Sequence, residues 1–225
     1  MTAPSDWRSA FPLRSAEDAV DALLDAWNRL VAKPPPGISA RTHEPKLTKH
    51  LKVSLENVVS REHGLLGNWT AEDVIGQLDP NTGELAETRR TDIAYCWNNE
   101  TQSLKLVFEF KRLGKQKRHR DEYLGARGLA RYVTGIYASE QPVGAMVGIL
   151  LAPTADIVPQ LQAVLADNDF ATALRLRNND ADSPYTQPST LFAQALFDTE
   201  HDRDPPHAPP HGYIRVAHFF VSFKE

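Results

Sequence analysis

Three charged residues are placed in the sequence where they could do chemistry together: Asp92, Glu109 and Lys111. Glu109 and Lys111 are two residues apart in a segment rich in Phe, Leu and Val, a composition typical of a β-strand. Strand side chains alternate between faces, so Glu109 and Lys111 would share one face while Phe110 points to the other. Two carboxylates at one point favour a hard cation such as Mg²⁺. A lysine beside them can orient a water nucleophile or offset developing negative charge, which suits phosphodiester cleavage.

Two adjacent strands would bring these residues to one point. Residues 90–97 are predicted to form the first strand, residues 98–102 a hairpin loop and residues 103–111 the second strand. On the first strand Asp92 would share a face with the small side chain of Ala94, which leaves space beside a carboxylate. This arrangement favours a pocket over simple packing.

Each charge also has a simpler explanation as part of an ion pair. Asp92 could pair with Arg89 or Arg90, which precede it in the sequence. Glu109 could pair with Lys111, or across the strands on an exposed face. Glutamate is depleted in strands and is rarely buried without a partner, so the sequence favours a ligand role for Glu109.

The pattern resembles the signature of the PD-(D/E)XK nuclease superfamily, in which an aspartate is followed on the next strand by Glu/Asp-x-Lys. The matching residues are Asp92 and then Glu109, Phe110 and Lys111, with Thr91 where the superfamily often has proline. The resemblance implies an α/β fold with a restriction-endonuclease-like core, a central mixed sheet flanked by helices in the order α-βββ-α-β. It also implies a Mg²⁺ site, in which Mn²⁺ can substitute. Asp92, Glu109 and the Phe110 carbonyl would be its ligands, and Lys111 would act in catalysis with the two carboxylates.

The same resemblance implies an acidic residue on the helix before the sheet. Glu44 is the candidate, as a metal ligand and a catalytic residue, because a helix is predicted over residues 44–62. Pro45 would fit at the first helical position, so the competing explanation for Glu44 is a helix-capping role.

The remaining elements follow from apolar periodicity and from turn residues. A helix over residues 15–31 and the Pro-rich connector 33–37 form an N-terminal accessory segment, residues 1–40, and residues 41–225 form the nuclease-like domain. The other predicted elements are strands at 69–78, 143–151 and 213–223, helices at 121–138 and 153–166, a turn at 79–83, and loops at 178–190 and 199–211.

A dense run of basic residues follows the candidate site in the sequence. At the entrance of the site, these residues would neutralise the phosphates of a bound nucleic acid. The residues predicted to bind nucleic acid are Arg112, Lys115, Lys117, Arg118 and Arg120, together with Arg127 and Arg131, which lie four residues apart on the next predicted helix and would share a face. The simpler explanation is a solvated charged surface. Tyr123 and Tyr132 of that helix are predicted to pack in the core and not to stack on bases.

Composition narrows the class of protein. The chain has 225 residues, 41% hydrophobic and 24% charged, with a net charge of −4, which is typical of one soluble globular domain. A single cysteine, Cys96, excludes an intramolecular disulfide, and no apolar run reaches membrane-spanning length. No secretory signal is recognisable, so a cytoplasmic location is expected. His201, His207 and His211 are predicted to lie in an exposed loop and not in a metal site.

These inferences lead to one functional prediction and one alternative. The chain is predicted to be a Mg²⁺-dependent nuclease that hydrolyses phosphodiester bonds, of DNA in preference to RNA, in restriction, repair or phage defence. The alternative is a catalytically inactive domain of the same fold that binds nucleic acid or a partner protein. A homodimer through the helix over residues 15–31, or a defence or repair partner protein, is expected, and a membrane partner is not.

Overall fold

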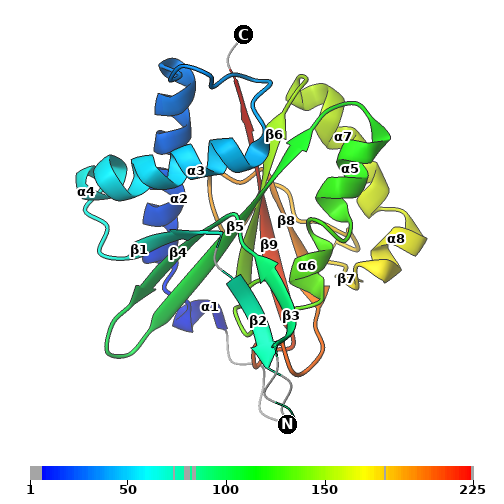
Figure 1. The fold of residues 1–225 in the computed structure, drawn as a ribbon. Helices are drawn as coiled ribbons and strands as arrows, with labels where there is room; N and C mark the ends of the chain where they lie inside the picture. Colours follow the sequence, from blue (N-terminus) through cyan, green and yellow to red (C-terminus); the bar gives the residue numbers. More distant parts are fainter. Residues whose placement is uncertain (1–6, 73, 79–81, 83–84, 180, 224–225) are drawn as a thin grey trace.

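The computed structural model describes residues 7–72, 74–78, 82, 85–179 and 181–223 and has an α/β architecture (Figure 1). Its helices are α1 (Trp7–Ala10), α2 (Leu13–Ala32), α3 (Glu44–Ser54), a π-helical turn (Leu55–Val59), α4 (Ser60–Glu62), α5 (Lys117–Leu124), α6 (Ala130–Val133), α7 (Thr154–Leu165) and α8 (Asn168–Ala173). Its strands are β1 (Asn68–Ala71), β2 (Val74–Leu78), β3 (Leu85–Arg90), β4 (Ile93–Asn98), β5 (Ser103–Leu113), β6 (Val143–Leu150), β7 (Leu176–Arg177), β8 (Phe197–Asp202) and β9 (Tyr213–Ser222).

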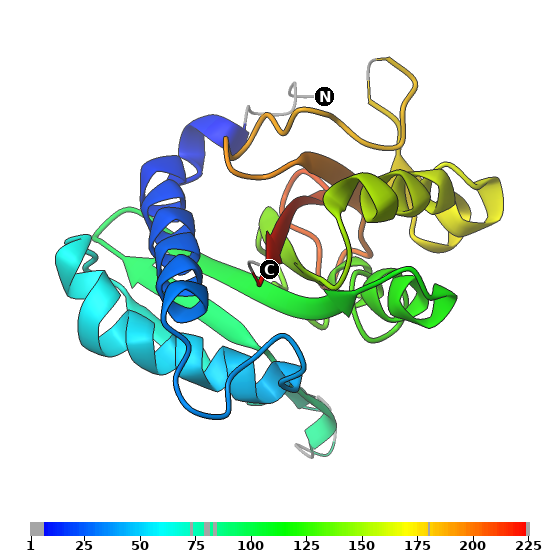
Figure 2. The ribbon, with the colours of Figure 1, turned by 90° about the horizontal axis from the view of Figure 1, so that it is seen from above.

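A seven-stranded mixed sheet forms the centre of the molecule, in the order β1-β4-β5-β6-β9-β8-β7. Its three middle strands, β5, β6 and β9, run parallel, and the outer strands pair antiparallel with their neighbours. Figure 2 shows helices α2 and α3 on one side of this sheet and helices α5, α7 and α8 on the other. The predicted α/β fold with a central mixed sheet flanked by helices is therefore confirmed.

Alternation along β5 separates the two apolar cores. Phe108 and Phe110 belong to the core shared with α2 and α3, whereas Val107 and Leu113 belong to the core shared with α5, α6 and α7. Glu109 has the odd-numbered parity of the second set, so it lies on the α5 and α6 face, as the alternation in the sequence predicts. Strand β6 is buried at every position and lies between β5 and β9, which confirms the predicted central strand.

The predicted helix over residues 121–138 is wrong as a continuous element. Helix α5 ends at Leu124, a turn follows, and the four-residue helix α6 comes after it. The backbone packs too closely for a side chain here, because a Cβ on Gly125 would lie 2.4 Å from the Asp121 carbonyl oxygen and one on Gly128 2.1 Å from that of Tyr123. The two glycines permit this tight turn, which redirects the chain toward the sheet.

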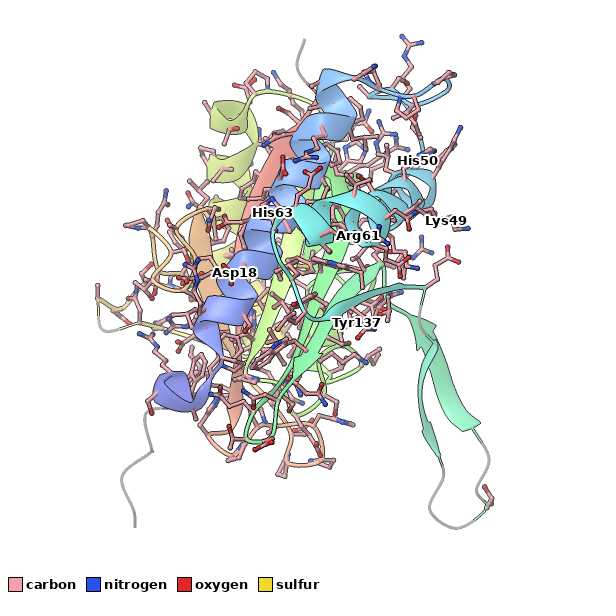
Figure 3. All side chains as sticks on the ribbon, turned by 90° about the vertical axis from the view of Figure 1, so that its left-hand side faces the viewer. Asp18, Lys49, His50, Arg61, His63 and Tyr137 are labelled. Carbon is pink, nitrogen blue, oxygen red and sulfur yellow. The ribbon has the colours of Figure 1, made fainter. Side chains whose placement is uncertain are left out.

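The strands predicted at residues 69–78 and 90–97 are each divided in the structure. Strand β1 pairs with β4 in the large sheet, while β2 and β3 form a separate hairpin that projects from the molecule (Figures 1 and 3). The turn predicted at residues 79–83 falls largely outside the described residues. Asp92 lies between β3 and β4, so its predicted position within a strand is wrong.

Strand β8 falls where residues 199–211 were predicted to be an exposed loop, so the prediction for its first part is wrong. The element is polar in sequence, yet Asp198, Thr199 and His201 are buried. His201 is completely buried, in contrast to its predicted exposure. Polar residues can be buried here because each has hydrogen-bond partners in the interior.

A buried hydrogen-bond chain links β8 and β9 to the helices. Tyr123 Oη lies 2.9 Å from His218 Nδ1, and Thr199 Oγ1 bridges His218 Nε2 at 2.9 Å and His201 Nε2 at 2.8 Å. His201 Nδ1 completes the chain at 2.8 Å from the Leu174 carbonyl oxygen. Burial lowers the pKa of His201 to about 4 and lowers the pKa of His218 well below its usual range. Both imidazoles are therefore neutral at neutral pH.

These histidines predict a loss of stability in acid. As the pH falls below about 6.5, the unfolded chain binds protons that buried His201 does not bind until about pH 4. The free energy of unfolding should fall by about 3 kcal/mol over that window through His201 alone. Urea unfolding at several pH values would measure it, and His201→Gln should flatten the slope. An unchanged slope in that variant would assign the acid sensitivity to other groups.

Among the described residues, no helix combines the length and the apolar character that a bilayer crossing needs.

Candidate active site

The Lys111 ammonium lies at the centre of a cluster of oxygen atoms. Its Nζ is 2.6 Å from Glu109 Oε1, 3.0 Å from Glu44 Oε1 and 3.9 Å from Asp92 Oδ2. It also donates a hydrogen bond of 2.7 Å to the Phe110 carbonyl oxygen. The structure thus brings together all the residues that the sequence predicted as catalytic or metal-binding, from α3, the β3–β4 junction and β5.

Asp92 is positioned by the end of a strand pairing. The ladder between β4 and β5 ends at Ile93 and Phe108, which leaves the N–H of Phe110 without a strand partner on that side. Asp92 Oδ2 accepts a hydrogen bond from this N–H at 2.9 Å. Because Asp92 lies just before β4 and is not part of the ladder, its carboxylate can accept this hydrogen bond, which fixes it beside Lys111.

Glu44 is positioned by the first turn of α3. The helix begins at Glu44, with His43 in the N-cap position and Pro45 second, so the alternative of a capping role for Glu44 is wrong. The Glu44 side chain instead reaches Lys111. Arg112 of β5 binds the loop that precedes α3. Its guanidinium donates hydrogen bonds to the carbonyl oxygens of Ala40 at 2.6 Å and Thr42 at 3.2 Å. Arg112, predicted to contact nucleic acid, thus has contacts within the chain that hold the start of α3 at the site.

Glu109 is the most deeply buried side chain of the cluster, with 1% of it exposed. Burial raises the pKa of Glu109 to about 8, and the carboxylate of Asp92 adds to this rise, while Lys111 opposes it. Its second oxygen, Oε2, is buried and accepts no hydrogen bond from the described residues. A buried acceptor without a partner is costly, so this oxygen is suited to a ligand that supplies positive charge.

The cluster contains more carboxylates than the one lysine can balance. Burial raises the pKa of Glu44 and of Asp92, and Lys111 lowers both. Burial pushes the pKa of Lys111 down, but Glu109, Asp92 and Glu44 outweigh it and raise the pKa overall, so Lys111 carries its charge. The site therefore groups three carboxyl groups around a single ammonium, and a bound cation would favour their charged forms.

Arg131 supplies a second positive charge to the cluster. Its Nη1 lies 3.7 Å from Glu109 Oε1 and donates a hydrogen bond to the hydroxyl of Tyr137, while its Nε donates to the Ala126 carbonyl oxygen at 3.2 Å. Arg131 was predicted to contact nucleic acid, and Tyr137 was not predicted to be a site residue. The two glycines of the turn before α6 were the available signal that this segment bends back toward β5.

The exposed part of the basic run is paired on the surface. Lys115 forms an ion pair with Asp156 at 2.9 Å, and Lys117 forms one with Asp121 at 2.8 Å. Arg120 donates to the side-chain oxygen of Gln160 and to the Lys115 carbonyl oxygen. Arg118 and Arg127 are exposed, and Arg127 lies in the turn before α6 and not on a helical face shared with Arg131. Exposed ion pairs contribute little energy, so these cations remain accessible to phosphates.

The carboxylates fit a hard divalent cation by their chemistry. Among the described residues, no group of three or more His, Cys, Asp or Glu side chains is arranged to hold a metal ion directly. Three carboxylates instead converge on an ammonium, with the unpartnered Glu109 Oε2 and the Phe110 carbonyl beside it. All of these are oxygen donors, which Mg²⁺ and Mn²⁺ accept.

Comparisons with known proteins add no relative. No protein-family model, no curated protein and no solved structure matches this chain. Any statement about its function therefore depends on the site itself.

Proposed function

We propose that this chain is a Mg²⁺-dependent nuclease that hydrolyses phosphodiester bonds, with DNA favoured over RNA. The observation that carries the proposal is the convergence of Glu44, Asp92 and Glu109 on Lys111 Nζ within 4 Å. Buried carboxylates grouped around one lysine are costly to stability, and such arrangements are concentrated at functional sites.

Each residue has a distinct role in the proposed reaction. Glu44, Asp92 and Glu109, with the Phe110 carbonyl, would hold the metal ion. When bound, the ion supplies Lewis-acid stabilisation of the charge that develops on the phosphoryl and leaving oxygen atoms. Lys111 orients the attacking water and offsets negative charge in the transition state. Exposed cations of the run, such as Arg118, bind the backbone phosphates on either side.

The order of elements supports the finer fold assignment, a restriction-endonuclease-like core. Helix α3 precedes β1, β4 and β5, which pair antiparallel in sequence order; the short helices α5 and α6 then lead to β6, parallel to β5. This is the α-βββ-α-β order that the superfamily resemblance implies. In this assignment, β7, β8 and β9 extend the sheet beyond the core, and the β2–β3 hairpin is an insertion.

The test is incubation of the purified chain with plasmid, linear duplex and single-stranded DNA, with Mg²⁺ and with EDTA. We expect cleavage that requires the metal, and calorimetry should show Mn²⁺ binding. Metal binding or DNA binding without cleavage would favour the inactive domain of the same fold. If neither binds and no DNA is cut, the cluster is a structural ion-pair network and the proposal is wrong.

A further inference from the structure

Glu109 has a partner on the side of the helices that metal ligation alone does not explain. The Arg131 guanidinium lies 3.7 Å from Glu109 Oε1, and only 21% of its side chain is exposed. Since Lys111 already contacts the same oxygen atom at 2.6 Å, Glu109 has two cationic neighbours. Arg131 is thus a half-buried charge that approaches the Glu109 carboxyl group in addition to Lys111.

The structure holds Arg131 in this position from two directions. Its Nε is fixed on the Ala126 carbonyl, and its Nη1 is fixed on the Tyr137 hydroxyl, with the guanidinium carbon 5.2 Å from the centre of the Tyr137 ring. Burial and the neighbouring Glu109 carboxylate raise the pKa of Tyr137, so its hydroxyl stays protonated at neutral pH. A charged side chain held this rigidly is preorganised and does not simply face solvent.

The Tyr137 ring is linked to the sheet through Tyr132. It packs edge to face against Tyr132, with ring centres 5.6 Å apart, and the Tyr132 hydroxyl lies 3.0 Å from the carbonyl oxygens of both Val107 on β5 and Ala145 on β6. A Cβ on Gly144 would lie 2.4 Å from the Tyr132 ring, so only glycine permits this approach. Figure 3 shows Tyr137 below α3, on the side from which the hairpin projects.

From this geometry we infer that Arg131, aimed by Tyr137, is a positioning residue that orients Glu109 for metal binding. The inference rests on the proposed function, because it assigns a role toward the ion that Glu109 would hold. Partners that orient a metal-binding carboxylate commonly change metal affinity 10- to 100-fold when they are removed. Arg131 would act through Glu109 and not by contact with the substrate.

The experiment is a calorimetric titration of the full chain with Mn²⁺ in the absence of DNA. Arg131→Gln should weaken Mn²⁺ affinity about 10- to 100-fold. Arg131→Lys should have a smaller effect, because it keeps the positive charge but lacks the planar guanidinium with its several N–H donors. Tyr137→Phe should weaken affinity in the same direction, since the ring remains but the hydroxyl that aims Arg131 is gone. In cleavage assays, the Arg131→Gln variant should need more Mg²⁺ for half-maximal rate yet approach the wild-type rate at saturating Mg²⁺.

Arg61→Gln is the matched control, because it removes the same charge from an exposed position on α4 that belongs to neither the carboxylate cluster nor the basic run. Its Mn²⁺ affinity should equal that of the wild type. Unchanged or tighter Mn²⁺ binding by both Arg131→Gln and Tyr137→Phe would overturn the inference while leaving the proposed nuclease intact. Should Arg131→Gln fail to fold, Tyr137→Phe decides the question alone. Absence of Mn²⁺ binding by the wild type would instead remove the proposed function, and the inference with it.

Discussion

Lys111→Met will lower the rate of Mg²⁺-dependent DNA cleavage about 10³-fold, while Mn²⁺ binding persists. Methionine keeps much of the unbranched stem but removes the ammonium that stands 2.6 to 3.9 Å from the three carboxylates. The loss of one preorganised donor in a water-poor site commonly costs about 3 to 4 kcal/mol of transition-state stabilisation. Metal affinity should not fall, because Lys111 lies among all three carboxylates that would hold the ion and competes with it, whereas Arg131 approaches Glu109 alone. The measurements are single-turnover cleavage of a labelled duplex and calorimetry with Mn²⁺.

Lys105→Met provides the matched control. Lys105 lies on β5 on the same face as Lys111, six residues earlier, and its side chain is half-buried. Its variant loses the same charge from the same strand and should cleave at close to the wild-type rate. Equal cleavage by wild type and the Lys111 variant would show that the lysine is a structural counter-ion and that catalysis, if present, lies elsewhere.

The elements that could be predicted from sequence are those whose apolar pattern agrees with their packing. Helix α2 was predicted over residues 15–31 and spans Leu13–Ala32, because one apolar stripe faces the sheet. Strand β6 was predicted over residues 143–151 from its continuous apolar run, which suits a strand covered on both faces. In these elements local pattern and tertiary environment give the same answer.

The elements that could not be predicted depend on contacts far apart in the sequence. Strand β8 has the composition of a loop, and it is buried only because Asp198, Thr199 and His201 meet partners on β9 and neighbouring loops. The break between α5 and α6 replaces a helix whose apolar spacing is otherwise regular. Gly125 and Gly128 signal that break, but isolated glycines are also tolerated in helices, so the pattern alone was ambiguous.

Some contacts of the candidate site could likewise be predicted from local sequence pattern, and others could not. Glu109 and Lys111 could be paired from strand alternation alone, and the structure places both on one face. The distance of Glu44 from this pair in the sequence is large, and only the superfamily resemblance suggested the contact. The approach of Arg131 to Glu109 could be derived neither from strand alternation nor from the superfamily resemblance. It depends on the turn at Gly125 and Gly128 and on the position of Tyr137.

Arg203→Met will lower the free energy of unfolding by about 4 kcal/mol, a loss that would consume much of the stability of a typical domain. Its buried guanidinium donates to the carbonyl oxygens of Tyr132 at 2.7 Å, Tyr137 at 2.6 Å and Ala138 at 2.6 Å. Each buried carbonyl left without a donor costs about 1 to 3 kcal/mol, and the relief of a desolvated charge offsets part of the sum. Urea unfolding at pH 7, followed by tryptophan fluorescence, would measure the change.

Two further variants separate the reasons for this effect. Arg175→Met removes a neighbouring but exposed arginine, whose Nη1 is 2.7 Å from Asp204 Oδ1, and should cost less than about 1 kcal/mol. Arg203→Lys keeps the charge but cannot reach three carbonyls in a plane, so it should lose most of what methionine loses. Full stability of the lysine variant would show that the positive charge stabilises the fold and that the planar guanidinium geometry does not. Because Arg203 holds the carbonyl of Tyr137, the residue that fixes this part of the fold also supports the side chain that positions Arg131 beside Glu109.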